Sequence, residues 1–590
     1  MRQLVEALLF ERIVPSEFVP RLGSTPHSET PLLYDHIVDF QVGDQRYRCL
    51  ATRGAFDRVR VAQGTIEKLG ADGATPATTR ELVGDLRLPI GAQQRLLGEL
   101  EQTLELTRWN SENLGHAPRR QLGFQELESV IHEGHQYHPC FKSRTGFSLQ
   151  DHRDYGPEAG RTFRLEWLAV RRDKLRAALP TDDESFWRHE LGSDVLGTLQ
   201  DRMRRLNLPW ETHSLLPVHP WQLRELSRTP SSRAFAARSR RAFATGELVP
   251  LGAAGDLYRA SQSLRTLVNV TAPRKPHVKL PLDIVSTSSP RMLRPHFVCS
   301  APSLSRWLRS ETEADGYFLP SHRPLLLEEY AGILYVPGDD AGPADLASPS
   351  GDGATLEGQL GVVFRQSVCA YLEPGQGAVP FTALTLVEAD RRPFVAEWLE
   401  QYGAERWATR LLEVTLLPLW HLLVHHGFAF ESHAQNLVLI HRDGWPERIA
   451  LRDFHEDTEF VPDYLRAPER VPDFAAIDPY FSEIPDDDGY RMADVASLRQ
   501  LFTDCAYVFN LADVSFLLHR YQHLPEARFW HIARTLLDAY AASGVTAPQR
   551  IARLGCDASE LPVESLLDKK IRGGGLLDYF EHTVTNTLRA

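Results

Sequence analysis

The sequence predicts an α+β protein with mixed sheets and a helical C-terminal region. Three observations support this prediction. Amphipathic helices flank a β-like piece in the first 125 residues, short β-rich runs follow up to residue 336, and the pattern turns strongly helical from Pro393. The chain has 590 residues, of which 43% are hydrophobic and 24% charged, values that argue against disorder, a collagen-like fibre or a coiled-coil rod.

The first segment begins with an amphipathic helix, which we expect over Gln3 to Glu11. Two glutamates interrupt its apolar stretch, so it does not resemble a signal peptide. A second helix is expected over Ala92 to Thr107, and the alternation in IVDFQV predicts β structure within Tyr34 to Leu50. The stretch Gly70 to Thr79 is rich in Gly, Ala, Thr and Pro and is expected to form a loop.

The middle of the chain is mainly β-like. A strand is expected over Phe163 to Val170, with helices up to Leu206. Ser227 to Arg241 is basic, and we interpret it as a solvated helix face in preference to an anion site. A flexible surface insertion is expected over Pro337 to Gly358, where Gly, Asp, Pro, Ala and Ser predominate. The further β-rich runs are Leu264 to Val270, Val278 to Val285 and Leu325 to Val336.

The last third is predicted to be helical around one hairpin. A helical pattern runs from Trp398 to Leu423, and helices are expected again after Met492. Between them, Asn436 to Ile440 and Arg448 to Leu451 are expected to pair around a turn at Arg442-Asp443-Gly444.

Charge and cysteine content restrict the classes of function. Lys and Arg number 65 and Asp and Glu 78, which gives a net charge of −13 and argues against binding to nucleic acid or anionic membrane by bulk charge. Six scattered cysteines without a CxxC argue against a zinc ribbon or a disulfide scaffold. The most apolar segment, 414–430, contains a proline and three histidines and fits a buried helix better than a membrane span. We therefore expect a soluble cytoplasmic protein with no nucleic-acid or membrane partner.

No standard nucleotide or hydrolase motif is present. There is no GxxxxGK[ST], no GxGxxG after a strand and no GxSxG. Residues 132–147 instead gather three histidines, Lys142 and Arg144. Such donors and fixed cations suit a phosphate or polycarboxylate. A metal site on His132, His135 and His138 and a plain polar loop remain alternatives, although the HExxH spacing is not met. His219, which precedes Pro-Trp, is interpreted as a hydrogen-bonded structural histidine.

A second set of cations and hydroxyls lies in the β-rich region. Hydroxyls and cations that converge from neighbouring strands provide the charge neutralisation and the donors that a phosphate chain requires. Each residue alone is uninformative, but the grouping favours a phosphate site. Its members are Ser263, Arg265, Thr266, Lys279, Thr287 and Arg291.

The predicted hairpin carries the strongest spacing signal. An acidic and amide loop, Glu431 to Asn436, precedes its first strand, and Asp453 follows its second. The hairpin returns the chain, so these groups meet at one end and offer the oxygen ligands that Mg²⁺ prefers. His433 between them could contact a phosphate or the reacting carboxylate. Protein kinases use a comparable arrangement, so a kinase-like phosphotransferase is an alternative, and a surface hairpin with incidental acids is another.

Taken in order, these clusters resemble the NRPS-independent siderophore synthetases of the IucA/IucC family. The family's GHPxHPxxKxRxGF element is similar to residues 134–147, where Gln136 replaces the first proline. The SxRT element resembles 263–266, a K…T…R series resembles Lys279, Thr287 and Arg291, ExHxQN resembles 431–436, and an RD pair resembles Arg452-Asp453. The motifs span 134 to 453, and the chain length suits a whole family member.

The resemblance implies a hand-like architecture of thumb, fingers and palm. The corresponding parts would be a thumb-like domain at 1–125, a fingers-like domain at 126–375 with phosphate- and carboxylate-binding elements, and a palm-like domain at 376–590 with the metal-binding hairpin. It also implies an ATP-dependent ligase that adenylates a carboxylate, commonly of citrate or a related polycarboxylate. An amine or hydroxyl nucleophile then displaces AMP. Family members are often dimers, so a homodimer is possible.

The resemblance further implies roles for individual residues. His433 and Arg291 would be catalytic and lie near the α-phosphate and the reacting carboxylate. Substrate would be bound by His138, Lys142 and Arg144. Mg²⁺ would be held by Glu431, Asp453 and Gln435. ATP would be bound by Ser263, Arg265, Thr266, Lys279, Thr287 and Asn436. A non-catalytic carrier of a ferric or anionic ligand is a third alternative.

Overall fold

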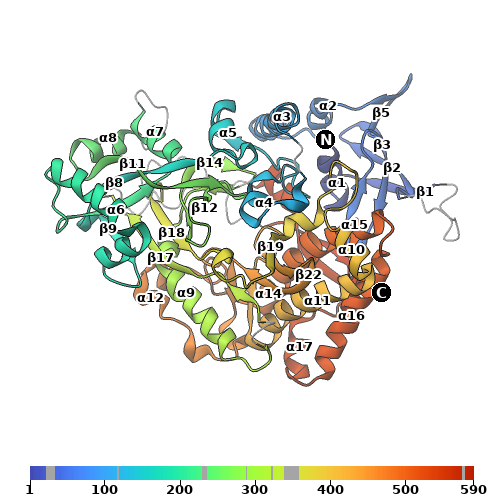
Figure 1. Ribbon diagram of the computed structural model, residues 1–590. Helices are drawn as coiled ribbons and strands as arrows, with labels where there is room; N and C mark the ends of the chain where they lie inside the picture. Colours follow the sequence, from blue (N-terminus) through green and yellow to red (C-terminus); the bar gives the residue numbers. More distant parts are fainter. Residues whose placement is uncertain are drawn as a thin grey trace.

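The computed structural model describes residues 1–21, 33–115, 118–228, 236–287, 289–319, 323–337, 358–573 and 579–589. It confirms an α+β protein (Figure 1). The expectation of mixed sheets holds only for the four-stranded sheet of the C-terminal part, where residues 325–326 run parallel to 450–451; the other paired strands of the described residues are antiparallel. Figure 1 shows the blue N-terminal sheet and the red C-terminal helices on the same side of the molecule, and the large green sheet on the opposite side. The predicted insertion at 337–358 lies almost entirely outside the described residues.

An antiparallel six-stranded sheet forms the N-terminal part. The stretch 34–50 contains the hairpin β2–β3, and the loop expected at 70–79 is wrong, because β5 and β6 pair there. Gly73 has a φ of +118°, so the chain turns sharply between those strands where other residues would be strained. The strands are β1 (Ser16–Pro20), β2 (His36–Val42), β3 (Gln45–Arg53), β4 (Val59–Val61), β5 (Glu67–Gly70) and β6 (Gly73–Pro76). The helices of this part are α1 (Arg2–Phe10), α2 (Thr79–Asp85), α3 (Ile90–Asn113) and α4 (Phe124–Val130).

An eight-stranded antiparallel sheet, with the order β10-β8-β11-β12-β13-β18-β17-β9, dominates the middle of the chain. Side chains alternate along β17: Ile333 and Tyr335 pack with Trp187 of helix α6, whereas Leu334 packs with Val298 of helix α9. The two helices therefore cover opposite faces of the sheet. The strands are β8 (Phe163–Arg171), β9 (Leu175–Ala178), β10 (His213–Val218), β11 (Leu248–Ala260), β12 (Thr266–Asn269), β13 (His277–Lys279), β17 (Glu329–Tyr335) and β18 (Gly361–Arg365). The helices are α5 (Leu149–Tyr155), α6 (Asp183–Arg205), α7 (Pro220–Ser227), α8 (Ala236–Ala244) and α9 (Pro295–Glu313).

Two predicted strands are each divided between two sheets. The run 278–285 breaks at Pro281, which has no backbone N–H to donate, and continues as β14 (Leu282–Ser286) between β7 (Arg144–Thr145) and β15 (Ser289–Arg291). The run 325–336 becomes β16 (Leu325–Leu326), which pairs with the hairpin strand β22, and β17 of the large sheet. Both runs are mainly extended, as expected. The predictions were wrong only in treating each run as one strand of one sheet.

The C-terminal part contains the predicted hairpin, which is confirmed as β21 (Leu437–Arg442) and β22 (Trp445–Leu451). The hairpin belongs to a four-stranded sheet with β16 and β19 (Gln376–Pro380), and α11 packs on β22. The expectation of helices throughout the region after Met492 is wrong at β24 (Glu560–Glu564) and β25 (Glu581–Thr585), which pair with each other. The remaining strands are β20 (Phe428–Phe430) and β23 (Thr458–Phe460). The helices are α10 (Ala396–Tyr402), α11 (Ala404–His421), a π-helix (Leu422–His426), α12 (Phe474–Ile477), α13 (Tyr480–Glu483), α14 (Val495–Phe502), a π-helix (Thr503–Leu511), α15 (Ala512–Arg520), α16 (Glu526–Ala542), α17 (Pro548–Leu554) and α18 (Leu566–Arg572).

One hydrophobic cluster joins the two ends of the chain, from Leu4 to Leu588. Glu11, just after α1, accepts hydrogen bonds from the backbone N–H groups of Leu567 and Asp568, both at 2.8 Å. The apolar segment 414–430 is largely buried, as expected, but only its first part is helical: α11 and the π-helix end at His426, and Phe428–Phe430 forms strand β20. In the described part of the chain, Val495–Arg520 is long and apolar enough to cross a membrane, but 78% of its apolar window is buried, as in a core helix.

Candidate active site

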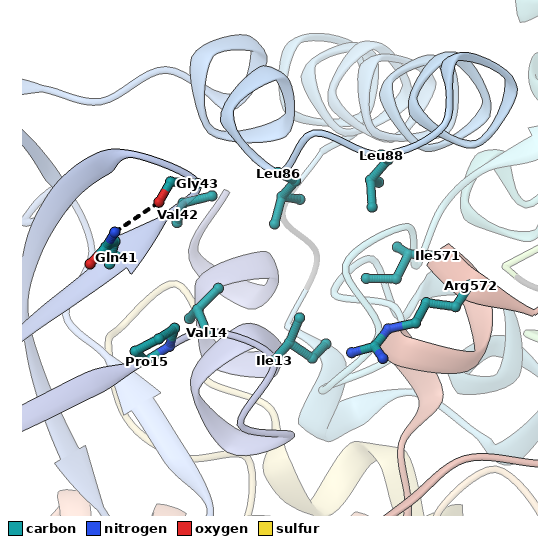
Figure 2. A pocket seen from close by; sticks show the side chains of 10 residues that line it. All are labelled: Ile13, Val14, Pro15, Gln41, Val42, Gly43, Leu86, Leu88, Ile571 and Arg572. Atoms are coloured by element: carbon teal, nitrogen blue, oxygen red, sulfur yellow. Dashed lines mark hydrogen bonds between the residues drawn. The ribbon is translucent and has the colours of Figure 1, made fainter.

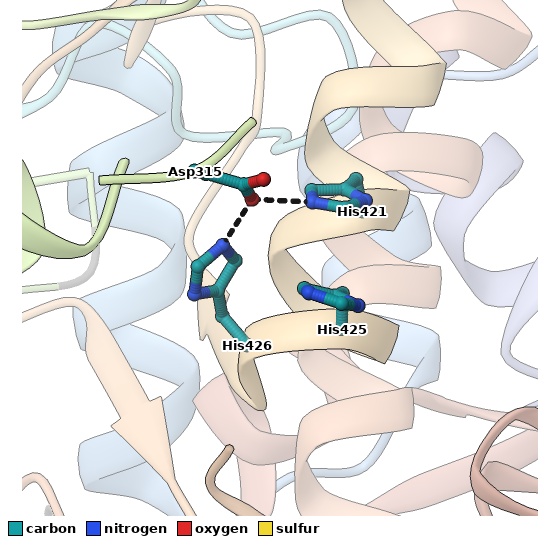
Figure 3. A group of neighbouring side chains, drawn as sticks. All are labelled: Asp315, His421, His425 and His426. Atoms are coloured by element: carbon teal, nitrogen blue, oxygen red, sulfur yellow. Dashed lines mark hydrogen bonds and ion pairs between the residues drawn. The ribbon is translucent and has the colours of Figure 1, made fainter. Parts of the chain in front are cut away.

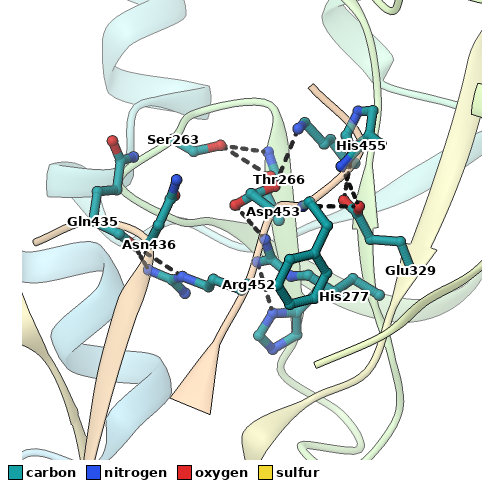
Figure 4. A network of polar contacts seen from close by, with 12 residues as sticks. Ser263, Thr266, His277, Glu329, Gln435, Asn436, Arg452, Asp453 and His455 are labelled. Atoms are coloured by element: carbon teal, nitrogen blue, oxygen red, sulfur yellow. Dashed lines mark hydrogen bonds and ion pairs between the residues drawn. The ribbon is translucent and has the colours of Figure 1, made fainter. Parts of the chain in front are cut away.

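Three segments distant in sequence meet at Asp453. Lys279, at the end of β13, places its Nζ 3.1 Å from one carboxylate oxygen of Asp453, and Arg365, at the end of β18, places a guanidinium nitrogen 2.5 Å from the other. Lys279 and Arg365 come from adjacent antiparallel strands, and Asp453 follows β22 (Figure 4). The large sheet and the predicted hairpin therefore join through one carboxylate held by two cations.

Asp453 is held in an unusual conformation as well as an unusual charge environment. Its φ is +62°, which is uncommon for a residue other than glycine. Burial opposes its ionisation, but Arg365, Lys279 and Arg452 outweigh burial and hold the pKa of its carboxyl well below the ordinary value. The Asp453 side chain is therefore ionised across the physiological range and is positioned by the surrounding structure.

Glu329 fixes the turn that follows Asp453. Its carboxylate accepts the backbone N–H groups of Phe454 and His455 at 3.1 and 3.0 Å and the Nδ1–H of His455 at 2.7 Å. All these groups are buried. A charged acceptor with several donors is well satisfied and confines the turn to one geometry.

Arg265 and Lys279 are brought together by a second acidic residue. Glu456 accepts from Arg265 at 2.8 Å and lies 3.8 Å from the Nζ of Lys279. The Oγ of Ser263 accepts the backbone N–H of Thr266 at 3.2 Å, and the two side-chain hydroxyls lie 2.9 Å apart. Four of the residues predicted to bind phosphates thus lie close together, and Figure 4 shows two of them, Ser263 and Thr266, beside Asp453.

The loop Glu431 to Asn436 forms the more open side of the network. The side chains of Glu431 and His433 are 38% and 25% exposed, whereas those of Lys279 and Arg365 are 5% and 3% exposed. Asn436 donates from its side-chain amide to the carbonyl of Glu431 at 3.0 Å, so it tightens the loop. The Glu431–His433 side of the network is therefore the more accessible to solvent, and Lys279 and Arg365 are the more buried.

The ring of His433 has a defined tautomer. Its Nδ1 accepts the backbone N–H of Gln435 at 3.2 Å, so in the neutral ring the proton is on Nε2, which lies 3.2 Å from the Glu431 carboxylate. Burial opposes the ionisation of Glu431, but His433 outweighs it and lowers the pKa of that carboxyl. His433 is therefore arranged to donate a hydrogen bond through Nε2.

Arg452 holds this loop in place from below. Its guanidinium donates to the carbonyl of Gln435 at 2.9 and 2.6 Å and to the carboxylate of Glu128 in α4 at 2.8 Å. Arg452 and Glu128 are both buried, so this ion pair is a structural clamp. Gln435, which Figure 4 shows beside Asn436, takes part in the network through its backbone carbonyl.

Excess acid borders the network. Burial, together with Glu431 and Glu456, raises the pKa of the Asp457 carboxyl well above its ordinary value. Burial, and then Glu431, raises the pKa of Glu459 to about 8. These shifts show carboxyl groups close enough to oppose each other's ionisation, and a bound cation would relieve that opposition. The oxygen donors present therefore fit a hard divalent ion such as Mg²⁺.

Arg291, on β15, lies beside the network, whereas Thr287, in the turn before β15, contacts Ser143 and Lys570. Burial, and then the neighbouring charge of Arg265, lowers the pKa of Arg291 to about 10, so Arg291 stays protonated at neutral pH. Its guanidinium donates to the carbonyl of Ser286 at 3.1 Å, and its buried Nε has no hydrogen-bond partner among the described residues. Thr287 donates its backbone N–H to Ser143 at 3.1 Å.

The predicted substrate residues of the 132–147 loop form a separate network. The carboxylate of Glu158 accepts a hydrogen bond from the Nζ of Lys142 at 2.9 Å and two from the guanidinium of Arg144 at 2.8 and 3.0 Å. All three side chains are buried. His138 is buried, and its Nδ1 accepts the backbone N–H of Cys140 at 3.2 Å. The structure thus joins these cations to Glu158 and not to Asp453, and their role in substrate binding stays a prediction.

The histidines of that loop do not form the alternative metal site in the described part of the chain. His135 uses its Nδ1 to accept the backbone N–H groups of Tyr137 and His138, both at 3.1 Å. The interpretation of His219 as a structural residue is confirmed, because its Nδ1 accepts the N–H of Trp221 and caps α7.

Several members of this network carry little or no signal in the amino-acid sequence. Arg365 ends an apolar strand, GVVFR, and that abrupt change from apolar to cationic was its only signal. Glu456 and Asp457 directly follow the predicted metal residue in the run DFHED and could have been included on that ground. Glu329 could not be distinguished from any other glutamate at a strand end.

A cavity of about 340 Å³ lies elsewhere, among the N-terminal strands and α18 (Figure 2). Its lining combines apolar side chains, among them Ile13, Leu86 and Ile571, with polar groups such as those of Gln41 and Arg572. It contains none of the predicted site residues and none of the cation–carboxylate network.

Comparison with known proteins identifies the family. The IucA / IucC family model matches residues 123–386, and a model described as a ferric iron reductase FhuF-like transporter matches residues 405–573. The chain is 30% identical over 541 residues to the citryl-spermidine/3,4-dihydroxybenzoyl-citryl-spermidine:spermidine ligase of Bacillus anthracis, covering 90% of this chain and 84% of that relative. It is 30% identical over 538 residues to aerobactin synthase of Escherichia coli, covering 86% of each.

The structural comparison agrees. The petrobactin biosynthesis protein AsbB from Bacillus anthracis str. Sterne superposes with a TM-score of 0.86 at 27% identity, over 100% of this chain and 94% of that one. The relatives are synthases and ligases of siderophore biosynthesis. By sequence over most of its length, and by fold, the chain belongs to the IucA/IucC family.

Proposed function

We propose that this protein is an ATP-dependent siderophore synthetase. It adenylates a carboxylate of citrate, or of a citrate derivative, and condenses the activated acid with an amine or hydroxyl nucleophile. The relatives' names support the acid and the nucleophile, since one is a citryl-spermidine:spermidine ligase and another is an aerobactin synthase. The observation that carries the proposal is the placement of Lys279, Arg265 and Arg365 around Asp453 and Glu456.

The cation set fits two polyanionic substrates. In the first step, a carboxylate oxygen bonds to the α-phosphorus of ATP and pyrophosphate leaves. Negative charge gathers on the phosphorus oxygens, and fixed cations stabilise that charge without reorganising. Lys279 and Arg265 already form ion pairs with carboxylates, so phosphate oxygens would replace or join these partners. Arg291, next to Arg265, stays protonated and offers a buried Nε that has no hydrogen-bond partner among the described residues.

The acidic border supports a magnesium site. Glu431, Asp453 and Gln435 offer oxygen ligands. Glu456 adds a negative charge, because Arg265 and Lys279 outweigh burial and hold the pKa of its carboxyl well below the ordinary value. A bound cation would also favour ionisation of Asp457, whose pKa burial and the neighbouring carboxylates raise. Mg²⁺ would supply charge neutralisation between the pyrophosphate leaving group and these carboxylates. Arg452 and Glu329 would keep the ligand loop and the Asp453 turn in position.

His433 suits a donor role better than a base role. Its Nδ1 is engaged by a backbone N–H, and its Nε2–H faces the open side. It would donate to an oxygen of the reacting carboxylate or of the α-phosphate. In the second step the nucleophile bonds to the acyl carbon, AMP leaves, and the proton that the nucleophile loses passes to a carboxylate or to solvent.

The test measures the products of the purified full-length protein. It is incubated with ATP, Mg²⁺ and citrate against a panel of amines, with hydroxylamine as a trap in parallel. AMP, pyrophosphate and a citryl hydroxamate are expected. ADP and a phosphorylated acid would instead establish a kinase-like phosphotransferase and overturn the proposal.

A variant pair connects the chemistry to the network. Arg291→Met removes a cation without breaking an ion pair and should lower the rate of pyrophosphate release by about 100-fold. Arg274→Met removes an exposed arginine from the loop before β13 and should leave the rate unchanged. Equal rates in both variants would exclude Arg291 from the reaction.

A further inference from the structure

A second group of ionisable side chains lies at the end of α11. Asp315, His421, His425 and His426 place one ligand atom each within 4.8 Å of one another. His421 and His426 direct their Nε2 atoms at the same oxygen of Asp315, at 2.6 and 2.5 Å (Figure 3). The π-helix Leu422–His426 brings His425 and His426 round to the side of His421, and such helices are frequent at functional sites. None of these residues belongs to the Asp453 network.

Outer hydrogen bonds orient two of the three rings. The Nδ1 of His421 lies 2.7 Å from the Tyr540 hydroxyl, and that hydroxyl lies 2.8 Å from Thr546. The Nδ1 of His425 lies 3.1 Å from the same Thr546 hydroxyl. Metal-binding histidines are held in this way, with one ring nitrogen on an outer partner and the other on the ion.

The hydrogen bonds of the third ring, His426, are incomplete, which suggests that a ligand binds here. If its Nε2–H donates to Asp315, its buried Nδ1 is an acceptor for which the described residues offer no hydrogen-bond partner, and it faces the Glu311 carboxylate at 3.9 Å. Two acceptors that face each other in a buried place are unfavourable. A metal ion on Nε2 moves the ring proton to Nδ1, where it points at Glu311, and no proton is gained or lost.

The geometry points to a zinc site formed by Asp315, His421, His425 and His426. Three imidazoles and one carboxylate are a tetrahedral zinc donor set, with bonds of about 2.0 Å and donors about 3.3 Å apart. The two Asp315 contacts would lengthen slightly and His425 would move inwards. Asp315 supplies one negative charge to the ion, and Glu311, which also pairs with Arg470, supplies a second one next to the ring of His426.

One contact of the cluster must open before an ion can bind His425. The guanidinium of Arg466 contacts the Nε2 of His425, the most exposed of the three histidines. Arg466 is itself exposed, so it can rotate into solvent and free that nitrogen. The bound ion would fasten the end of α9 to the end of α11 and would therefore stabilise the fold.

The test uses the full-length protein and Zn²⁺ alone. The protein is stripped with a chelator, incubated with Zn²⁺, desalted and analysed for metal, and its melting midpoint is measured in parallel. About one zinc per chain is expected, with a midpoint rise of about 2 °C or more that excess Mg²⁺ does not reproduce. Less than about one zinc per ten chains would overturn the proposal and leave the cluster as a hydrogen-bond network.

Variants locate the bound ion. Asp315→Asn keeps the buried shape, and His425→Gln changes only a half-exposed side chain; each should reduce zinc retention at least about 10-fold. His523→Gln, a half-exposed histidine outside the cluster, should retain it fully, and Arg466→Ala should retain at least as much as the unmodified chain. Unchanged retention in folded His425→Gln and Asp315→Asn would place the ion elsewhere and refute the site.

Discussion

Asp453→Asn tests the central network most directly. The side chain keeps its size, but the charge between Lys279 and Arg365 is lost. Each of these charge-assisted contacts is worth about 1.5–3 kcal/mol, and the asparagine carbonyl can keep one of them while its amide N–H faces the other cation. A loss of about 2–4 kcal/mol in the free energy of unfolding is therefore expected at pH 7.

The pH dependence of that loss follows from the direction of the pKa shift. The folded pKa of Asp453 lies well below its unfolded value, so its contribution is fully present above the unfolded pKa and disappears as pH falls through the folded one. Urea unfolding at several pH values should thus show a constant difference from the unmodified protein above about pH 5 and a shrinking one below about pH 4.

Activity supplies the second readout of the same variant. Removing this carboxylate should reduce Mg²⁺-dependent pyrophosphate release at least about 100-fold while circular dichroism shows a folded chain. Asp443→Asn is the matched control, because Asp443 lies in the turn at the other end of the same hairpin with a φ of +49°, which asparagine tolerates. Unimpaired turnover in Asp453→Asn, or an equal loss in Asp443→Asn, would refute the reasoning.

Three further changes probe other parts of the structure. Arg452→Met leaves Glu128 buried without its ion-pair partner and should lower the free energy of unfolding in urea by about 3–5 kcal/mol. The double variant Arg452→Met with Glu128→Met should restore most of that loss. A loss below about 1 kcal/mol in the single variant would contradict the structural role of this ion pair. Glu459→Gln removes a carboxyl whose pKa in the folded protein, about 8, is higher than in the unfolded chain. Ionisation of Glu459 therefore destabilises the folded protein increasingly as pH rises from about 4.5 to 8. The free energy of unfolding of the variant should exceed that of the unmodified protein by up to about 4 kcal/mol at pH 8 and should equal it at pH 4. Gly444→Ala should lower stability by about 2–4 kcal/mol, since its φ is +86° and the new Cβ would lie 2.1 Å from Trp398; an unchanged melting midpoint would disprove the close approach.

Local structure was predictable where local chemistry decides it. The hairpin β21–β22 was expected from two apolar runs and the Asp-Gly pair between them, and both turn residues do adopt positive φ. The helix α11 was expected from its periodicity. The prediction of a loop at 70–79 was wrong, because a segment rich in Gly, Ala, Thr and Pro has the same composition in a loop and in a tight hairpin. Here a glycine turn lets residues 67–70 pair with 73–76.

Strand partners were not predictable in the same way. The runs 278–285 and 325–336 are extended as expected, yet each divides between two sheets. An extended apolar run has the same pattern whichever sheet it joins, because the pairing partner is chosen by packing and not by its own residues. Arg365 was missed for this reason, since only the neighbouring strand β13 places it beside Asp453.

The amino-acid sequence alone determined the local elements, the family resemblance and which residue types were present to do chemistry. Tertiary structure decided which charges meet. Lys142 and Arg144 pair with Glu158, 16 and 14 residues away, whereas Lys279 reaches Asp453, 174 residues away. A buried cation must find an anion somewhere, but the sequence does not say which one, because the partner is set by how strands and helices pack around it.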